Sequence, residues 1–405
     1  MKILHITRAI DPSGGCEIYI RNLISILSED FHQSFVLTAL APTEPLPKSS
    51  PSFVIKKLAA LDHSNAKASA QELIQVLKIV QPDLIHIHDL NNPYTIEYCG
   101  KNYPTVKTTL NADAYCGGID KYLYTSQKEC KFSLGLHCLP IAYYEKCMKR
   151  HPRRAIEIIS VKLDALKVLD FMSAVIVPSE SSRKILTQNR VSNSKIKTIP
   201  LFAHFSKDES HASYPKHNPN ILFLGRLRPY KGAHFLLKAV AKIRTNCPLF
   251  IVGDGEDRPK LETLSSKLGI QNRVRFFGNV PHDQVGQFLD SCSLLAVPSI
   301  YPDSFPTVGL EAMRHSRPVV GFQIGGIPEW LTHEKSGFLV KSQDIDGFAE
   351  KMDFLIENPD VAERMGQFGY AQYLERFSPD AHRMMINKTY QEAIQSFNKL
   401  MTSAR

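Results

Sequence analysis

Short apolar runs alternate with amphipathic segments along most of the chain, and this alternation restricts the fold more than any other feature. In the first half, apolar runs typical of strands occur at Lys2–Thr7, Ser34–Thr38, Phe53–Lys57, Leu84–His88, Val106–Leu110 and Ala174–Val177. Helical patterns lie between them, for example at Glu17–Leu27 and Ala70–Val80. Strands of this length that alternate with helices indicate βαβ units and a parallel sheet covered by helices. We therefore predict an α/β fold.

The same alternation starts again after a polar segment, so we predict two domains. A chain of 405 residues is too long for one ordinary core. Residues 206–220 are polar and contain two prolines, a composition typical of a linker. Further strands are expected at Ile221–Gly225, Leu249–Val252, Val274–Phe277, Leu294–Val297 and Pro318–Phe322, and helices at 347–370 and 379–400. The predicted domains are 1–205, with an insertion at 111–151, and 221–378, followed by a terminal helix within 379–405.

The charge of the chain favours an anionic partner. The net charge is +9 and the isoelectric point is near 9.0. Nucleic acid is the weakest candidate, because the sequence has no RNP motif, zinc finger or arginine-rich arm. No apolar run approaches the ~20 residues of a membrane span, and the N-terminus lacks the apolar core of a signal peptide. We expect a cytoplasmic protein.

Two carboxylates frame the most informative motif, residues 301–329. Asp303 and Glu311 stand eight residues apart, with a Ser-Phe-Pro-Thr turn between them that should open a helix. A strand beginning at Pro318 and a Gly325-Gly326 loop follow. A helix N-terminus offers unpaired N–H groups to a phosphate, and an acid inside the helix can hold sugar or ribose hydroxyls.

This block resembles the donor site of retaining glycosyltransferases of the GT-B type, family four. There the pattern is Glu, seven residues, Glu, Ala-Met, a Pro-Val-Val strand and Gly-Gly-x-Pro-Glu. This chain departs from it at Asp303, where Glu is usual, and at residues 314–317, where a small residue and a Gly are usual. The resemblance implies two Rossmann-like doubly wound domains facing across a cleft, with the last helix crossing back to the first domain.

The resemblance also implies roles for the carboxylates and the turn between them. Glu311 should hold the ribose hydroxyls of the donor, and Asp303 should contact the sugar hydroxyls. Backbone amides of the intervening turn should face the phosphates and the sugar; these belong to Ser304, Phe305, Pro306, Thr307 and Val308, of which proline supplies no N–H. The alternative reading is that both acids only cap the helix.

A second motif, Gly225-Arg226-Leu227 followed by Lys231-Gly232, comes directly after the first strand of the second domain. An arginine fork and a lysine point charge can together neutralise a leaving diphosphate without a metal. The pattern matches the diphosphate clamp of the family. Two solvated surface cations are the alternative.

Glycine-rich strand ends supply the remaining donor-side candidates. By resemblance, Gly253, Asn279 and Val280 lie near the base, which backbone groups read. In the first domain, Gly14 and Gly15 form a loop between strand and helix that lets the backbone approach a ligand. This loop looks like the family's Gly-Gly-x-Glu loop against the donor diphosphate, although a tight turn alone would show the same glycines.

Asn111 occupies the position at which the family carries a histidine near the anomeric carbon of the donor. Asn can donate and accept hydrogen bonds but cannot titrate. By resemblance, the leaving diphosphate helps to take the acceptor proton, so no side-chain base is required. His86, His88 and Asp89 end the preceding strand, and we interpret the histidines as packed or capping residues.

Four of the eight cysteines, Cys116, Cys130, Cys138 and Cys147, fall within the insertion. A cytosolic chain does not favour a disulfide framework, and no C-x-x-C pair marks a zinc site. We expect buried thiols, with a metal site and a redox role as alternatives.

The region Lys146–Arg154 contains five basic residues and no acid. It is either a solvated helix end or a docking site for an anionic membrane, with Tyr143 and Tyr144 at the headgroup level. Docking would place the protein on the inner face of the membrane.

The sequence therefore predicts a hexosyl or other glycosyltransferase. It would use a UDP- or GDP-linked sugar, no metal or other cofactor, and a hydroxyl of a glycan or lipid-linked acceptor, in cell-surface polysaccharide or glycolipid synthesis. A catalytically weak accessory protein that binds sugar nucleotides and a nucleotide-sugar epimerase are the alternatives.

Overall fold

The computed structural model describes residues 1–12, 14–118, 120–148, 151–203, 213–216 and 218–403. The chain forms two compact units. Unit 1 comprises Met1–Ser126, Cys130–Leu201 and Pro379–Arg405, and unit 2 comprises Gln127–Glu129 and Phe202–Ser378. Residues 204–212 and 217 of the predicted linker lie outside the described residues. Residues 213–216 pack on unit 2, where the Tyr214 hydroxyl donates a hydrogen bond to the Ser293 carbonyl at 3.0 Å.

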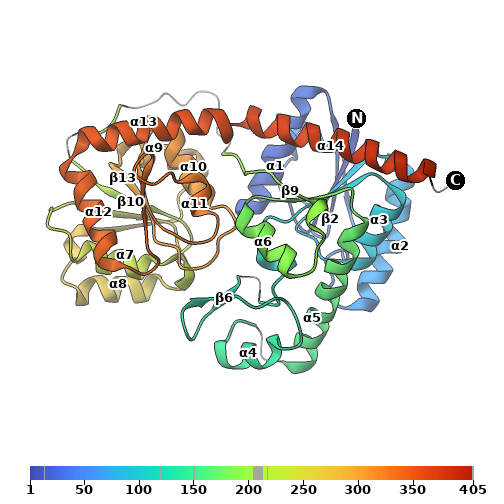
Figure 1. Ribbon diagram of the computed structural model, residues 1–405, viewed down its shortest axis with the longest axis horizontal. Coiled ribbons are helices and arrows are strands. Elements are labelled where there is room, and N and C mark those ends of the chain that lie inside the picture. Colours follow the sequence, from blue (N-terminus) through green and yellow to red (C-terminus); the bar gives the residue numbers. More distant parts are fainter. Residues whose placement is uncertain (13, 119, 149–150, 204–212, 217, 404–405) are drawn as a thin grey trace. The chain divides into compact units, whose positions relative to one another are not determined.

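Unit 1 is a seven-stranded parallel sheet in the order β3-β2-β1-β4-β5-β8-β9 with helices around it (Figure 1). Its strands are β1 Lys2–Thr7, β2 Gln33–Thr38, β3 Ser52–Val54, β4 Leu84–His88, β5 Thr105–Thr108, β8 Ala174–Val177 and β9 Ile196–Thr198. Its helices are α1 Gly15–Leu27, α2 His63–Val80, α3 Pro93–Asn102, α4 Cys138–Glu145, α5 Pro152–Lys167, α6 Glu180–Gln188 and α14 Pro379–Ser403.

Unit 2 is a six-stranded parallel sheet in the order β12-β11-β10-β13-β14-β15. Its strands are β10 Ile221–Leu224, β11 Leu249–Val252, β12 Val274–Gly278, β13 Leu294–Val297, β14 Val319–Phe322 and β15 Gly337–Val340. Its helices are α7 Ala233–Val240, α8 Arg258–Lys267, α9 Val285–Ser291, α10 Thr307–Arg314, α11 Ile327–Trp330, α12 Ile345–Glu357 and α13 Pro359–Arg376. Two-residue strands β6 Tyr122–Leu123 and β7 Lys128–Glu129 lie in the insertion. The α/β prediction with parallel sheets is confirmed.

Several boundaries differ from the sequence prediction, each for a local reason. The strand expected at Phe53–Lys57 ends at Val54, because a turn closes there with the Leu58 N–H donating to the Ile55 carbonyl. The helix expected at 347–370 is wrong as one element. It divides into α12 and α13 at Asn358-Pro359, since proline lacks the N–H and disfavours the helical conformation of the residue before it.

A histidine cluster lies at the centre of unit 1. His5 of β1 and His86 of β4 are register partners, and His88 follows on the same face. All three side chains are fully buried, and their ring nitrogens lie within 4.8 Å of one another. His5 Nδ1 is 3.1 Å from His88 Nε2, and His86 lies between the hydroxyls of Tyr390 and Thr108, each at 2.6 Å.

These histidines form a neutral network and do not suit a metal. Both nitrogens of His86 already contact hydroxyls, and the buried Lys107 is close enough to lower the pKa of His86 and His88 further than burial alone. A metal cation here would also be repelled by the nearby Lys107 ammonium group. The network instead holds α14 on unit 1 through Tyr390. His382 of the same helix adds contacts to the Tyr19 hydroxyl at 3.0 Å and the Pro200 carbonyl at 2.8 Å.

The stability of unit 1 should fall in mild acid. Burial lowers the pKa of His5 to about 3 and that of His382 to about 4, so between these values and about 6.5 the unfolded chain binds more protons. This stabilisation is complete above pH 6.5 and is lost as the pH falls, by up to about 1.4 kcal/mol per pH unit for each group. Urea unfolding between pH 7.5 and 5 should show a steep decline in the wild type and a shallower one in His88→Leu. An exposed control, His333→Gln, should keep the wild-type slope; equal slopes in all three proteins would contradict this account.

Candidate functional site

The carboxyl ends of the parallel strands of unit 2 gather the predicted donor-site residues at one edge of the sheet. Lys231 follows β10, and Asp303 follows β13. The Lys231 Nζ atom is 2.7 Å from Asp303 Oδ2, and both side chains are at least three-quarters buried. The Tyr301 hydroxyl donates a second hydrogen bond to the same carboxylate oxygen at 2.6 Å. The structure thus joins two residues that stand 72 positions apart in the chain.

At this edge two backbone segments approach each other so closely that only glycine fits between them. Gly325 has φ of 56°, and a Cβ there would lie 2.5 Å from the Asp303 carbonyl oxygen. At Gly326 a Cβ would lie 2.2 Å from the Ser304 carbonyl oxygen. The Gly326 N–H donates to the Asp303 carbonyl at 2.8 Å. The Gly-Gly loop therefore fixes the turn that carries Asp303 and leads into α10.

Helix α10 begins at Thr307 after the predicted turn. Its N-cap, Pro306, makes no side-chain capping bond. The Gly309 N–H donates to the Pro306 carbonyl at 3.3 Å, so the N–H groups left for another acceptor are those of Thr307 and Val308. Ser304, Phe305 and Pro306 are buried, whereas Thr307 and Val308 are partly exposed. Gly309 lets α10 lie directly against the Trp330 indole of α11, because a Cβ at this position would lie 2.2 Å from the ring.

Glu311 projects from the second turn of α10 and is only partly exposed. No hydrogen bond or ion pair to its carboxylate is present among the described residues. Burial raises the pKa of Glu311 to about 7. An unpaired, poorly solvated carboxylate is costly, and such groups cluster at functional sites. Glu311 therefore has the properties of an acceptor for ligand hydroxyls and not those of a helix cap.

The cation motif after β10 contains Lys231, which pairs with Asp303, and Arg226, which forms no ion pair with a described residue. The Arg226 side chain is exposed, and its guanidinium makes no ion pair with any described residue. Gly232, between Lys231 and α7, has φ of 75° and lies against the Pro298 carbonyl, where a Cβ would come within 1.8 Å. This contact fixes the loop that places Lys231 beside Asp303.

The ends of β10, β11 and β12 meet through glycines. Gly253 has φ of 127° and would place a Cβ 2.0 Å from the Gly225 carbonyl oxygen, and its N–H donates to Gly278 at 2.7 Å. Space beside Gly225 is open, with no atom within 4 Å of a Cβ built there. Asn279 is exposed and Val280 is partly exposed at the end of β12. These positions present backbone groups at the same sheet edge as Lys231 and Asp303.

The predicted first-domain residues lie at the corresponding edge of the unit 1 sheet. Gly14 is the extended N-cap of α1 without a side-chain capping bond, and no atom lies within 4 Å of a Cβ built at Gly15. Asn111 follows β5. Its side-chain oxygen accepts from the Asp113 N–H at 2.8 Å, and its Nδ2 lies 3.5 Å from Cys16 Sγ. Asn111 thus braces its own turn and connects it to the glycine loop.

Sequence reasoning missed a charged group around Asn111. Burial, and next the neighbouring Asp113, raise the pKa of Asp89 to about 6, and a side-chain hydrogen bond from Asn111 partly offsets this rise. Lys107 is buried, its Nζ donates to the Leu90 carbonyl at 2.7 Å, and burial lowers its pKa to about 8. Lys162 pairs with Asp113 at 2.6 Å. For Asp89 and Lys107 the available signal was their position just after β4 and within β5, whereas Lys162 lies on helix α5 and carried no such signal.

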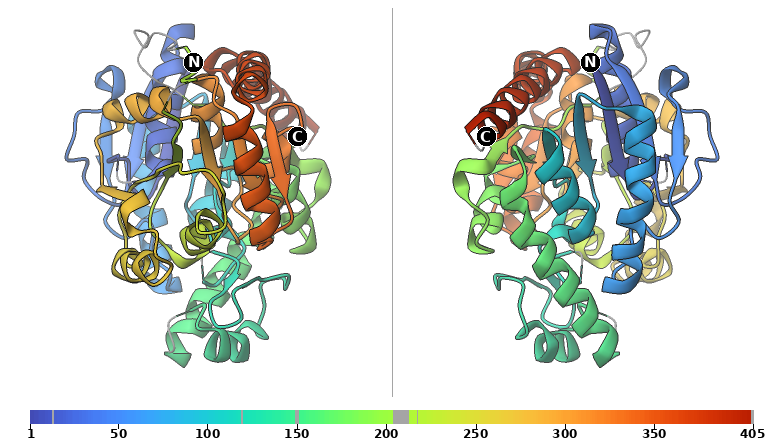
Figure 2. Two further views of the ribbon diagram at one scale, coloured as in Figure 1. Left: turned by 90° about the vertical axis from the view of Figure 1, so that its left-hand side faces the viewer. Right: turned by 90° about the vertical axis from the view of Figure 1, so that its right-hand side faces the viewer.

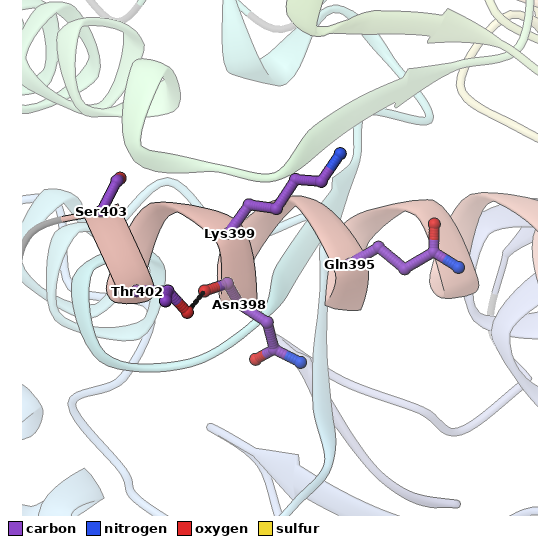
Figure 3. Close-up of a pocket in the computed structure, with 5 residues that line it drawn as sticks. All are labelled: Gln395, Asn398, Lys399, Thr402 and Ser403. Atoms are coloured by element: carbon purple, nitrogen blue, oxygen red, sulfur yellow. Dashed lines mark hydrogen bonds between the residues drawn. The ribbon is translucent and has the colours of Figure 1, made fainter.

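A shallow depression on α14 has no such chemistry (Figure 3). Five side chains of one exposed helix face line it, namely Gln395, Asn398, Lys399, Thr402 and Ser403. The Thr402 hydroxyl donates to the Asn398 carbonyl within the helix at 2.8 Å. We regard the two sheet edges as the functional surfaces.

Comparison with known proteins identifies the unit that carries the Lys231–Asp303 pair. Residues 206–372 match the family described as Glycosyl transferases group 1. This segment is thus similar to the group 1 glycosyl transferases. An uncharacterized glycosyltransferase of Methanocaldococcus jannaschii is 35% identical over 162 residues, 40% of this chain and 41% of its own length. The D-inositol 3-phosphate glycosyltransferase of Streptomyces coelicolor is 31% identical over 194 residues, 45% and 42% of the two chains. The matches span less than half the length of these relatives.

Solved structures extend the likeness to both units at the level of fold. Sucrose-phosphate synthase from Thermosynechococcus elongatus has a TM-score of 0.73 at 19% identity and covers 98% of this chain and 99% of its own. Anabaena HepE in complex with UDP-glucose has a TM-score of 0.70 at 20% identity, with coverage of 96% and 99%. The fold is GT-B, as predicted. No described helix has the length and apolar character needed to cross a membrane.

Glu311→Gln should stabilise the protein in a pH-dependent way. Because burial raises the pKa of Glu311 from 4.5 to about 7, the stabilising protonated form is complete below pH 4.5 and is lost as the pH rises through 7. Replacing the carboxylate by a neutral amide should therefore raise the melting temperature at pH 8 and change it little at pH 5. Glu350→Gln, at an exposed position of α12, should have no such pH-dependent effect. A melting temperature that falls at pH 8 would show that the carboxylate has a stabilising partner.

Proposed function

We propose that this protein is a retaining glycosyltransferase. It moves a sugar from a UDP- or GDP-linked donor to a hydroxyl of a glycan or lipid-linked glycan, in the synthesis of a cell-surface polysaccharide or glycolipid. The observation that carries the proposal is the unpaired Glu311 carboxylate, one helix turn from open N–H groups, at the edge that holds the Lys231–Asp303 pair. Similar proteins support the proposal, since one is a D-inositol 3-phosphate glycosyltransferase and another forms a complex with UDP-glucose.

Each part of this edge suits one part of a nucleotide sugar. Glu311 accepts hydrogen bonds from the ribose hydroxyls, and Asp303 accepts from hydroxyls of the transferred sugar. Arg226 and Lys231 neutralise the diphosphate as it leaves, and the first N–H groups of α10 add fixed dipoles. Lys231 has three donors, so it can contact both Asp303 and a phosphate. The base lies against backbone groups near Gly253, Asn279 and Val280.

In this proposal the acceptor proton passes to the leaving diphosphate, so no divalent metal or side-chain base is required for transfer. Asn111 orients a ligand hydroxyl and does not titrate. Asp89, whose pKa is raised to about 6, makes a side-chain hydrogen bond with Asn111 and suits an acceptor hydroxyl. In this proposal the neighbouring Asp89 carboxylate supplies the titratable group that Asn111, unlike the histidine of the family, lacks.

A panel of nucleotide sugars tests the proposal. A donor present at 100 times its dissociation constant should stabilise the fold by about 2.7 kcal/mol in a thermal-shift assay. The sugar that gives the largest shift should then release its nucleotide when acceptor glycans are added. A panel of UDP- and GDP-sugars that produces no shift would refute the proposal.

Asn111 favours one alternative function, that of an accessory protein that binds sugar nucleotides without turnover. Its amide oxygen is occupied by the Asp113 N–H, which leaves fewer groups for catalysis than a histidine would. This alternative predicts donor binding without nucleotide release in the presence of a cell-envelope extract. An epimerase would instead change the sugar while it stays attached to its nucleotide.

Lys231→Ala should lower turnover by about 10²–10³-fold while donor binding weakens less, because the cation matters most as charge develops on the diphosphate. Arg226→Lys should also slow turnover, since a point charge does not replace the guanidinium fork. Steady-state kinetics with a matched surface variant, Lys267→Ala on α8, provide the control. Wild-type turnover in Lys231→Ala would remove this residue from the site.

Peripheral membrane attachment is part of the proposal for the acceptor. Tyr143 and Tyr144 are 64% and 73% exposed on α4, and Arg153 and Arg154 are exposed at the start of α5. Lys149 and Arg150 of the predicted basic region lie outside the described residues. Exposed tyrosines beside basic side chains suit an anionic headgroup layer.

Replacing Lys149, Arg150, Arg153 and Arg154 by Ser should reduce flotation with vesicles that contain anionic lipid. Each basic residue can contribute about 1 kcal/mol near such a surface, an effect that salt screens. Neutral vesicles and a matched quadruple lysine-to-serine variant on unit 2 are the controls. Equal flotation with neutral and anionic vesicles would contradict attachment by charge.

A further inference from the structure

The four cysteines of the insertion come from four separate stretches of chain and converge. None of the eight cysteines, all of which are described, forms a disulfide. Cys99, Cys247 and Cys292 are buried as expected, but the prediction of buried thiols is wrong for the insertion, whose four cysteines are partly exposed. The insertion projects beside α5 (Figure 2), and Cys116 and Cys138 pack against the edge of the unit 1 core.

Backbone contacts bring Cys116 and Cys147 together. The Gly118 N–H donates to Cys116 Sγ at 3.3 Å. The same glycine lies against the Cys147 carbonyl, where a Cβ would come within 1.9 Å of the oxygen. The chain segments that carry Cys116 and Cys147 are therefore in direct contact.

Cys130 and Cys138 approach the same point through Lys121. The Cys130 N–H donates to the Lys121 carbonyl at 2.7 Å, and the buried Lys121 side chain reaches the Phe132 carbonyl. Burial raises the pKa of Cys138, with further contributions from Cys116 and Cys130, while Lys121 lowers it. Burial, and next the other three thiols, raise the pKa of Cys147 to about 12. Each thiol is thus within electrostatic range of the others.

The insertion has few buried apolar side chains outside the part that packs on the unit 1 core. Helix α4 has eight residues and a single buried side chain, Ala142. The other described apolar side chains buried in the insertion between 115 and 145 are Tyr115, Tyr122 and Leu134. Tyr115 and Leu134 belong to the unit 1 core, and Cys116 and Cys138 pack against that core. The outer part of the insertion, around β6, β7 and α4, therefore buries little apolar surface of its own, a condition under which a metal or disulfide commonly stabilises a segment.

We propose that Cys116, Cys130, Cys138 and Cys147 bind one structural zinc ion as four thiolates. Thiolate sulfur is a preferred zinc ligand, and four of them form a closed tetrahedral site. Binding releases the four thiol protons to solvent and leaves a net charge of −2, which the buried Lys121 partly offsets. No three of the sulfur atoms lie within 4.8 Å of one another among the described residues, so binding includes side-chain rotation to Zn–S distances of about 2.3 Å.

Metal analysis of the full chain tests the proposal independently of transferase activity. Protein expressed with added zinc and purified under reducing conditions should contain about one zinc per chain. A mercurial that titrates thiols should release this zinc. Cobalt added to the zinc-depleted chain should produce the sulfur-to-metal charge-transfer absorption and d–d bands of a tetrahedral thiolate site.

Paired variants assign the ligands. Cys116→Ser with Cys147→Ser should lose the zinc and the cobalt spectrum, whereas Cys247→Ser with Cys292→Ser in unit 2 should retain both. Limited proteolysis should cut the first variant within 111–151 while circular dichroism reports the rest of the chain as folded. A wild-type chain that carries no zinc and gives no cobalt thiolate spectrum overturns the proposal, as does a zinc content unchanged in the first variant.

Discussion

Parallel strand pairing determines where this protein can act. Because β10, β11, β13 and β14 run in one direction, their following loops emerge at one edge of the unit 2 sheet. That edge receives Lys231 and Asp303 from loops far apart in the sequence, and it also receives the start of α10. Glycines at the close approaches, such as Gly232 and Gly325, are what allow these loops to pack so tightly. The charged pair and the unpaired Glu311 follow from this arrangement.

The two carboxylates at this edge differ in environment and therefore in proposed role. Asp303 has Lys231 and the Tyr301 hydroxyl as partners and is held in place before any ligand arrives. Glu311 has no described partner, and burial raises its pKa to about 7. A ligand that supplies two hydroxyl donors would remove the energetic cost at Glu311. The unpaired Glu311 carboxylate contributes unfavourably to folding, so stability does not explain its position, whereas ligand binding does.

The sequence predicted most strands, though not β9 and β15, and the parallel α/β class, because each depends on local pattern. The motif residues Lys231 and Asp303 lie together at one sheet edge, while their role in donor binding stays a prediction. Most strand limits agree within a residue. The Asn358-Pro359 pair is a local signal for a helix boundary. The helical pattern on both sides of it nevertheless led to the prediction of one helix at 347–370. By contrast, the histidine cluster around His86 and the raised pKa of Asp89 depend on which strands become neighbours. The convergence of the four insertion cysteines likewise depends on the paths of the loops that carry them, which the spacing of cysteines in the sequence does not determine.

Hydrogen–deuterium exchange with added nucleotide is the most direct test that this edge binds a nucleotide sugar. The full chain would be compared with and without saturating UDP or GDP, then with the corresponding sugar nucleotides. The account predicts slower amide exchange at residues 225–232 and 303–311, with unchanged exchange in α12. Protection confined to other segments, or no protection by any of these ligands, would contradict it.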